Sequence, residues 1–128
     1  MPGKKYNILY IDDEESNLRI FKNTFRRDFT IFLANSPQSG MDILKEKTID
    51  VLITDQRMPG CTGLELLKRI NEMFPEIPPH RLMVSGYAEP CDINTAYEQY
   101  GLFRFVSKPW DADELKQIIL TVIHTRHE

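Results

Sequence analysis

The chain has 128 residues and a formal net charge of −3, with 16 Lys and Arg against 19 Asp and Glu. This length fits a single domain, and a hydrophobic fraction of 41% argues against a disordered chain. The mild acidity argues against direct nucleic-acid binding, which needs a basic face. The apolar runs are too short to span a membrane and the N-terminus is polar, so we expect a cytoplasmic protein without membrane contact.

The two cysteines, Cys61 and Cys91, give no indication of a disulfide framework. They lie far apart in the sequence, and no paired histidines stand near them at the spacing of a zinc site. We therefore expect both to be ordinary reduced thiols.

The first part of the chain alternates between strand and helix patterns. Residues 6–11 and 29–33 are short, apolar and rich in β-branched and aromatic side chains, which is typical of strands. Between them, Leu18, Phe21 and Phe25 recur with helical spacing. This spacing predicts a helix that packs one face on a sheet.

The next predicted helix covers residues 37–47 and has a recognisable start. Asn35 or Ser36 provides an N-cap, and Pro37 fits the first turn of a helix. The apolar spacing within this segment is the weakest of the chain, so the cap carries most of the prediction.

The remainder of the chain repeats the alternation. Three more strands are predicted at Val51–Thr54, 81–84 and 103–106, and helical spacing recurs at 64–70, 93–100 and 115–123. Gly101 fits the end of the fourth helix, and Asp111 with Glu114 fits the start of the fifth. The whole pattern is (βα)₅, which predicts an α/β fold with a parallel sheet and crossover helices.

Chemically active side chains gather at the predicted strand ends. Asp12 and Asp13 follow the first strand, Asp55 the third, Ser85 the fourth and Lys108 the fifth. In an open parallel sheet the functional crevice lies beyond these carboxyl ends. Three acids brought together repel one another unless a cation or protons join them, and Mg²⁺ suits carboxylate oxygens. A carboxylate beside such an ion can attack a phosphoryl group, whose oxygens an ammonium and a hydroxyl can hold.

This ordered set of residues resembles the receiver domain of two-component response regulators, including the chemotaxis regulator. The resemblance is carried by Asp12-Asp13, by the segments DQRMPG at 55–60 and SGYA at 85–88, and by Lys108-Pro109. It covers essentially the whole chain, so residues 1–128 are expected to form one receiver domain. It implies a flavodoxin-like fold with a five-stranded parallel sheet in the order 2-1-3-4-5.

The resemblance implies that Asp55 accepts a phosphoryl group from a histidine kinase or a phosphotransfer protein. Mg²⁺, with Mn²⁺ as an alternative, would be held by Asp12, Asp13, Asp55 and the backbone carbonyl of Arg57. Asp13 in particular is expected to be a direct ligand. Such a domain catalyses its own phosphorylation and dephosphorylation and is not a conventional turnover enzyme.

The resemblance also implies a switch formed by Ser85 and Phe105. The hydroxyl moves toward the phosphoryl group, the aromatic ring follows, and the face made by the fourth helix, fifth strand and fifth helix repacks. The alternative is that Phe105 is simply a core residue. Ser85 and Lys108 are expected to hold the phosphoryl oxygens, and the peptide bond before Pro109 is expected to be cis.

The expected partners of the switching face are a downstream protein or a fused output domain, and a homodimer through this face is a further hypothesis. Segments 55–63 and 103–111 are similar to those of receivers attached to cyclic-dinucleotide phosphodiesterases or other signalling modules. Trp110 is expected to pack over the corner at Pro109, with a place in an interface as the alternative.

Two bulky residues beside the site give a hypothesis about phosphoryl lifetime. Arg57 and Tyr87 stand two positions beyond Asp55 and Ser85, where the family tunes hydrolysis. They are expected to restrict the attacking water, with Arg57 able to contact the phosphoryl group. The alternative is that both side chains point into solvent.

Three other classes of protein are alternatives to the receiver. A haloacid-dehalogenase phosphatase needs a second acid two residues after its nucleophile, where this chain has Arg57. A flavin or dinucleotide carrier needs a phosphate-binding loop after the first strand, where this chain is acidic. A pseudo-receiver that binds partners without phosphorylation stays open as the alternative function.

Overall fold

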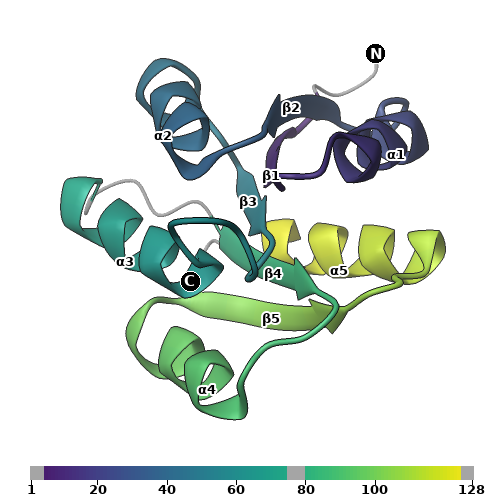
Figure 1. Cartoon of the computed structure of the whole chain (residues 1–128). Helices are drawn as coiled ribbons and strands as arrows, with labels where there is room; N and C mark the ends of the chain where they lie inside the picture. Colours follow the sequence, from purple (N-terminus) through teal and green to yellow (C-terminus); the bar gives the residue numbers. More distant parts are fainter. Residues whose placement is uncertain (1–4, 75–79, 125–128) are drawn as a thin grey trace.

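The computed structural model describes residues 5–74 and 80–124, which form alternating strands and helices (Figure 1). The strands are β1 (Asn7–Ile11), β2 (Thr30–Ala34), β3 (Val51–Thr54), β4 (His80–Ser85) and β5 (Leu102–Ser107). The helices are α1 (Glu15–Phe25), α2 (Pro37–Glu46), α3 (Gly63–Met73), α4 (Pro90–Gln99) and α5 (Ala112–His124). The predicted strand limits differ from these by at most one residue.

The strands form one parallel sheet in the order β2-β1-β3-β4-β5, which confirms the predicted flavodoxin-like topology. The pairing brings the last residues of neighbouring strands level with one another. Ile11 is opposite Ala34 and Thr54, and Ser85 is opposite Ser107. The residues that follow the strands therefore emerge at the same edge.

Two apolar layers fill the space between the sheet and its helices, with α1 and α5 on one face and α2, α3 and α4 on the other (Figure 1). Alternate residues of β1 point into different layers, since Leu9 and Ile11 belong to one cluster and Ile8 and Tyr10 to the other. The helical stripe predicted in α1 is buried, and the stripe of α5 is buried except for Ile118, which is half-buried. Within the described residues, none of the helices has the length and apolar character needed to traverse a bilayer.

Side-chain caps fix where three of the helices begin. The Ser36 hydroxyl accepts a hydrogen bond from the Ser39 backbone N–H at 3.1 Å, so Ser36 and not Asn35 is the cap of α2. Thr62 and Glu65 form a reciprocal capping box at the start of α3. Asp111 accepts from the Glu114 N–H at 2.9 Å before α5. These caps satisfy backbone donors that a helix start leaves unpaired.

Gly63 lets the start of α3 approach the end of β3 closely. Its backbone N–H donates to the Gln56 carbonyl oxygen at 2.9 Å. A Cβ at this position would collide with the backbone oxygen of Asp55 and lie 3.1 Å from the Gln56 Cα. The absence of a side chain at Gly63 therefore allows the loop that carries Asp55 to close against α3.

Replacing Gly63 with Ala is expected to destabilise the fold by about 1–3 kcal/mol, the usual cost of forcing atoms into a packed site. The free energy of unfolding in urea measures this. Gly86→Ala is the control, because a Cβ there meets no atom within 4 Å. We expect the control to change stability by less than about 1 kcal/mol. Equal losses in the two variants would contradict the close approach at Gly63.

Candidate functional site

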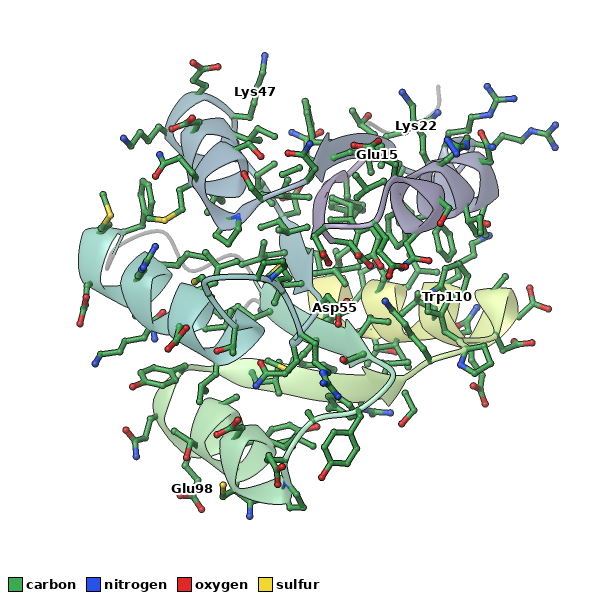
Figure 2. The ribbon with its side chains drawn as sticks, in the orientation of Figure 1. Glu15, Lys22, Lys47, Asp55, Glu98 and Trp110 are labelled. Carbon is green, nitrogen blue, oxygen red and sulfur yellow. The ribbon has the colours of Figure 1, made fainter. Side chains whose placement is uncertain are left out.

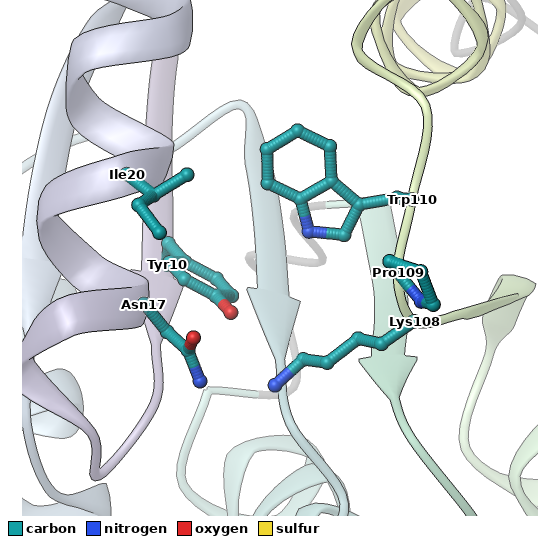
Figure 3. A pocket seen from close by; sticks show the side chains of 6 residues that line it. All are labelled: Tyr10, Asn17, Ile20, Lys108, Pro109 and Trp110. Carbon is teal, nitrogen blue, oxygen red and sulfur yellow. The ribbon is translucent and has the colours of Figure 1, made fainter.

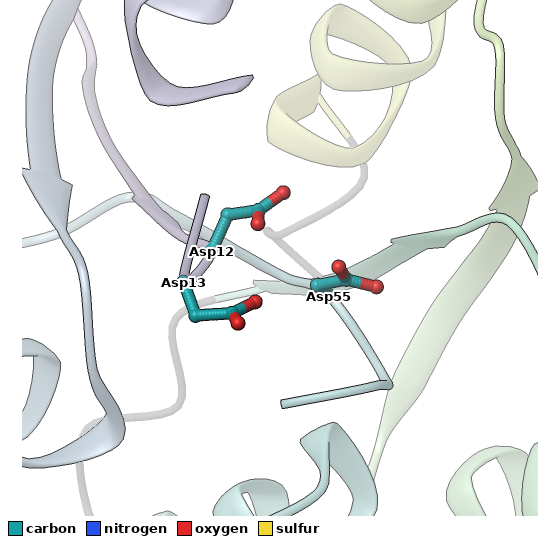
Figure 4. A group of neighbouring side chains, drawn as sticks. All are labelled: Asp12, Asp13 and Asp55. Atoms are coloured by element: carbon teal, nitrogen blue, oxygen red, sulfur yellow. The ribbon is translucent and has the colours of Figure 1, made fainter. Parts of the chain in front are cut away.

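The three predicted acids lie together where β1 and β3 end (Figure 4), and Figure 2 labels Asp55 near the middle of the view. Asp12 and Asp13 follow β1, and Asp55 follows β3. Each offers a carboxylate oxygen, and these oxygens lie within 4.8 Å of one another. Asp12 is fully buried, Asp55 is 7% exposed and Asp13 faces solvent. The site therefore has a closed inner side and an open outer side.

Asp12 lies at the centre of a hydrogen-bond network. Its Oδ2 accepts from the Tyr10 hydroxyl at 2.6 Å, the Lys108 Nζ at 3.0 Å and the Asn17 Nδ2 at 3.1 Å. Its Oδ1 accepts from the Glu14 backbone N–H at 3.0 Å. Burial by itself raises the pKa of Asp12, but the hydrogen bonds from Tyr10, Glu14 and Lys108 outweigh it and hold that pKa below its ordinary value. Asp12 is therefore a carboxylate near neutral pH.

The Lys108 ammonium bridges two of the acids, Asp12 and Asp55. Its Nζ donates to Asp12 Oδ2 at 3.0 Å and to Asp55 Oδ2 at 3.2 Å. Burial by itself lowers the pKa of Lys108, but the hydrogen bond to Asp12 and the charge of Asp55 raise it above its ordinary value. Lys108 follows β5, where its backbone N–H donates to the Ser85 carbonyl oxygen at 2.9 Å and its bond to Pro109 is cis.

Asp55 lies at the base of a cavity of about 440 Å³. Its Oδ2 contacts Lys108 and its Oδ1 accepts from the Arg57 backbone N–H at 3.4 Å. The cavity is lined by all the predicted catalytic and lifetime residues, namely Asp55, Arg57, Ser85, Tyr87 and Lys108. The predicted metal ligand Asp13 also lines it, together with Glu14, Asn17 and Gly86. A group that enters this cavity reaches the Asp55 carboxylate between one ammonium and two further acids.

The two predicted switch residues, Ser85 and Phe105, each take part in a hydrogen bond. Ser85 is 1% exposed, and its hydroxyl donates to the Tyr87 carbonyl oxygen at 3.1 Å, within its own loop. Phe105 is half-buried against the apolar layer of α2, α3 and α4, and its backbone N–H donates to the Tyr97 hydroxyl oxygen at 2.7 Å. The Tyr87 side chain is 52% exposed, and it lines the mouth of the cavity while also meeting solvent.

Sequence reasoning missed three residues that hold the site in place. Tyr10 and Asn17 donate to Asp12, and Gln56 joins the loop after Asp55 to two helices. The Gln56 Oε1 accepts from the Leu64 N–H at 2.9 Å, and its Nε2 donates to Asp92 Oδ2 at 3.1 Å. Strand alternation could have placed Tyr10 on the same face as Asp12. No sequence signal marks Gln56.

A second cavity, of about 420 Å³, adjoins the site on the side of α1 (Figure 3). Tyr10, Asn17 and Ile20 line one wall, and Lys108, Pro109 and Trp110 line the other. The Trp110 ring packs against Phe25 at 5.6 Å and Phe21 at 6.2 Å between ring centroids. Trp110 therefore packs against two aromatic side chains of α1.

The donor set of the acidic cluster fits a hard divalent cation. All three side-chain donors are carboxylate oxygens, and the outer side of the cluster opens into a cavity that can hold water molecules. Cations such as Mg²⁺ combine one or two carboxylates with water and phosphate oxygens. The buried side of the cluster carries the hydrogen bonds that keep Asp12 ionised.

A comparison with protein families identifies this arrangement. Residues 8–120 match the response regulator receiver domain. The chain belongs to this family, whose members interact with histidine kinases in two-component signalling. An acidic cluster of this kind is typical of the receiver metal site.

The chain is also similar in sequence to transcriptional regulators. The hydrogenase transcriptional regulatory protein HoxA of Cupriavidus necator is 33% identical over 115 residues, which are 90% of this chain and 23% of the relative. The chain thus spans about a quarter of the curated relatives it matches.

Solved structures give the same result for the fold. A response regulator receiver domain protein from Clostridium thermocellum is 29% identical with a TM-score of 0.84, covering 94% of this chain and 96% of the other. The signal receiver domain of an HD domain-containing protein from Pseudomonas fluorescens Pf-5 has a TM-score of 0.88 at 24% identity, covering 97% and 98%. The latter likeness concerns the fold alone.

Replacing Asp13 with Asn is expected to stabilise the metal-free protein by about 1 kcal/mol, because it removes one charge from three that repel one another. In excess Mg²⁺ we expect the wild type to be the more stable of the two. Its free energy of unfolding rises by about 2.7 kcal/mol at one hundred times its Kd for Mg²⁺, whereas the variant binds the ion more weakly and gains less. Urea unfolding with EDTA or Mg²⁺ measures both. Glu98→Gln, on the exposed side of α4, is the control and should respond equally in both buffers. An unchanged order would contradict a cation site at Asp13.

Proposed function

We propose that this chain is the phosphoacceptor of a two-component system and that Asp55 receives the phosphoryl group. The observation that carries the proposal is the position of the Asp55 carboxylate. It lies at the base of an open cavity, within reach of the Lys108 ammonium and beside two further acids. The proposal extends over residues 1–128 as one receiver domain, acting in the cytoplasm.

The transfer forms one bond and breaks another. A carboxylate oxygen of Asp55 bonds to phosphorus, and the bond between phosphorus and the imidazole nitrogen of the kinase or phosphotransfer protein breaks. The displaced nitrogen keeps the electron pair. A bound Mg²⁺, held by Asp12, Asp13, Asp55 and the Arg57 carbonyl, would supply positive charge to the phosphoryl oxygens. Lys108 is placed to hold one of these oxygens, because its Nζ already lies 3.2 Å from Asp55 Oδ2.

The signal would pass from Asp55 to the face formed by α4, β5 and α5. The Ser85 hydroxyl, which donates to the Tyr87 carbonyl, would turn toward the phosphoryl group. Phe105 would then move further into the apolar layer against which it is half-buried. The contact from the Phe105 N–H to Tyr97 supports this route, because it links β5 directly to α4. The face would control a downstream protein, a fused output domain or a second copy of the chain.

Acetyl phosphate with Mg²⁺ tests the phosphoacceptor directly. We expect the intact mass of the chain to rise by one phosphoryl group, and the gain to require Mg²⁺. Asp55→Asn should abolish the gain, because the amide cannot form the acyl phosphate. Asp42→Asn, on the exposed surface of α2, is the matched control and should keep it. A chain that gains no mass would instead be a pseudo-receiver, and a gain that survives Asp55→Asn would place the phosphoryl group elsewhere.

Arg57→Ala and Tyr87→Ala are each expected to speed dephosphorylation several-fold. Both residues line the mouth of the cavity above Asp55, so they restrict the approach of water. Loss of the acyl phosphate with time, followed by intact mass after donor removal, measures the rate. Arg69→Ala, on the exposed side of α3 and outside the lining of this cavity, is the control. If both alanine variants lose the phosphoryl group at the wild-type rate, the two side chains do not protect it.

A further inference from the structure

Tyr10 lies beneath the acidic cluster and touches it through one hydrogen bond. It stands on β1 two residues before Asp12, which places both side chains on the same face. The ring is 1% exposed and stacks on Phe21 with centroids 4.5 Å apart. The phenol is therefore fixed by packing, and its hydroxyl donates to Asp12 Oδ2 at 2.6 Å (Figure 3 shows Tyr10).

The two oxygens of Asp12 have different surroundings within the described part of the chain. Oδ2 accepts hydrogen bonds from Tyr10, Asn17 and Lys108, whereas Oδ1 accepts one from the Glu14 backbone. A carboxylate offers about four acceptor positions over its two oxygens. Oδ2 is thus saturated and Oδ1 keeps acceptor capacity. A cation, or a water bound to it, would therefore bind to Oδ1.

Among the three donors to Oδ2, Tyr10 is the one committed to Asp12. Lys108 is shared with Asp55, and Asn17 also donates to Glu14 at 3.0 Å. The phenol has a single proton and gives it to Asp12. Under the proposed function, Lys108 turns to the phosphoryl oxygens. Tyr10 would then be the shortest contact still holding the Asp12 carboxylate.

We propose that Tyr10 is a positioning residue whose hydroxyl holds Asp12 with Oδ1 toward the divalent cation and thereby tightens cation binding. This inference rests on the proposed function, because it requires the cation site. Hydrogen bonds that orient metal ligands commonly contribute 10–100-fold to metal affinity. The carboxylate without this donor turns more freely and must be ordered when the cation binds.

The test is a Mg²⁺ titration of the full chain and of Tyr10→Phe, which keeps the ring and removes only the hydroxyl. Trp110 is the only tryptophan of the chain and lines a cavity with Tyr10 and Lys108, so its fluorescence reports binding. We expect Tyr10→Phe to weaken Mg²⁺ binding about tenfold. With acetyl phosphate, the Mg²⁺ concentration for half-maximal rate should rise by the same factor, while the rate at saturating Mg²⁺ stays near wild type.

Tyr6→Phe is the matched control. It also removes a phenol hydroxyl, but Tyr6 stands just before the first residue of β1, whereas the acids follow its last residue. It should titrate like the wild type. If Asp12→Asn weakens Mg²⁺ binding and Tyr10→Phe does not, the positioning role is overturned and the proposed function stands. If Tyr10→Phe lowers only the stability in urea, the hydroxyl is structural and the inference also fails. A wild-type chain that binds no Mg²⁺ overturns both proposals.

Discussion

Repulsion among three carboxylates is the constraint on which the rest of this structure depends. Asp12, Asp13 and Asp55 offer oxygens within 4.8 Å of one another, and Lys108 sets one positive charge among them. One ammonium leaves the cluster negative, so the site favours the arrival of a cation. Lys108 also ties the end of β5 to the ends of β1 and β3. A change of charge at Asp55 therefore acts directly on β5.

The backbone around Asp55 connects this charge cluster to the helices. Gln56 accepts from the first turn of α3 and donates to Asp92 in the first turn of α4. Tyr97 attaches the same α4 to β5 through the Phe105 N–H. Helix α4 thus has one hydrogen bond to the loop that carries Asp55 and another to β5. The two contacts form a physical connection between the site and the face that would bind a partner.

The sequence predicted the strands and the meeting of the acids, because alternating patterns and residues at strand ends depend on short-range rules. The order of the strands was implied by the resemblance to receiver domains, since no local pattern specifies it. The sequence could not predict the hydrogen bond from Tyr10 to Asp12, since a tyrosine in a strand is ordinarily a core residue and the partner of its hydroxyl depends on the folded structure. The contact from Gln56 to Asp92 joins the loop after β3 to a helix far along the chain, and no local pattern specifies such a pairing. The direction of the Ser85 hydroxyl, toward the Tyr87 carbonyl, is a rotamer that no pattern specifies.

The contact between Phe105 and Tyr97 also matters for how the sheet ends. β5 is an edge strand, and edge strands expose donors that can pair with a strand of another molecule. At Phe105 that donor is already satisfied by the phenol of α4. A neighbouring strand would have to displace the Tyr97 hydroxyl before it could pair with this N–H. The bond thus removes one open backbone donor from the edge of β5.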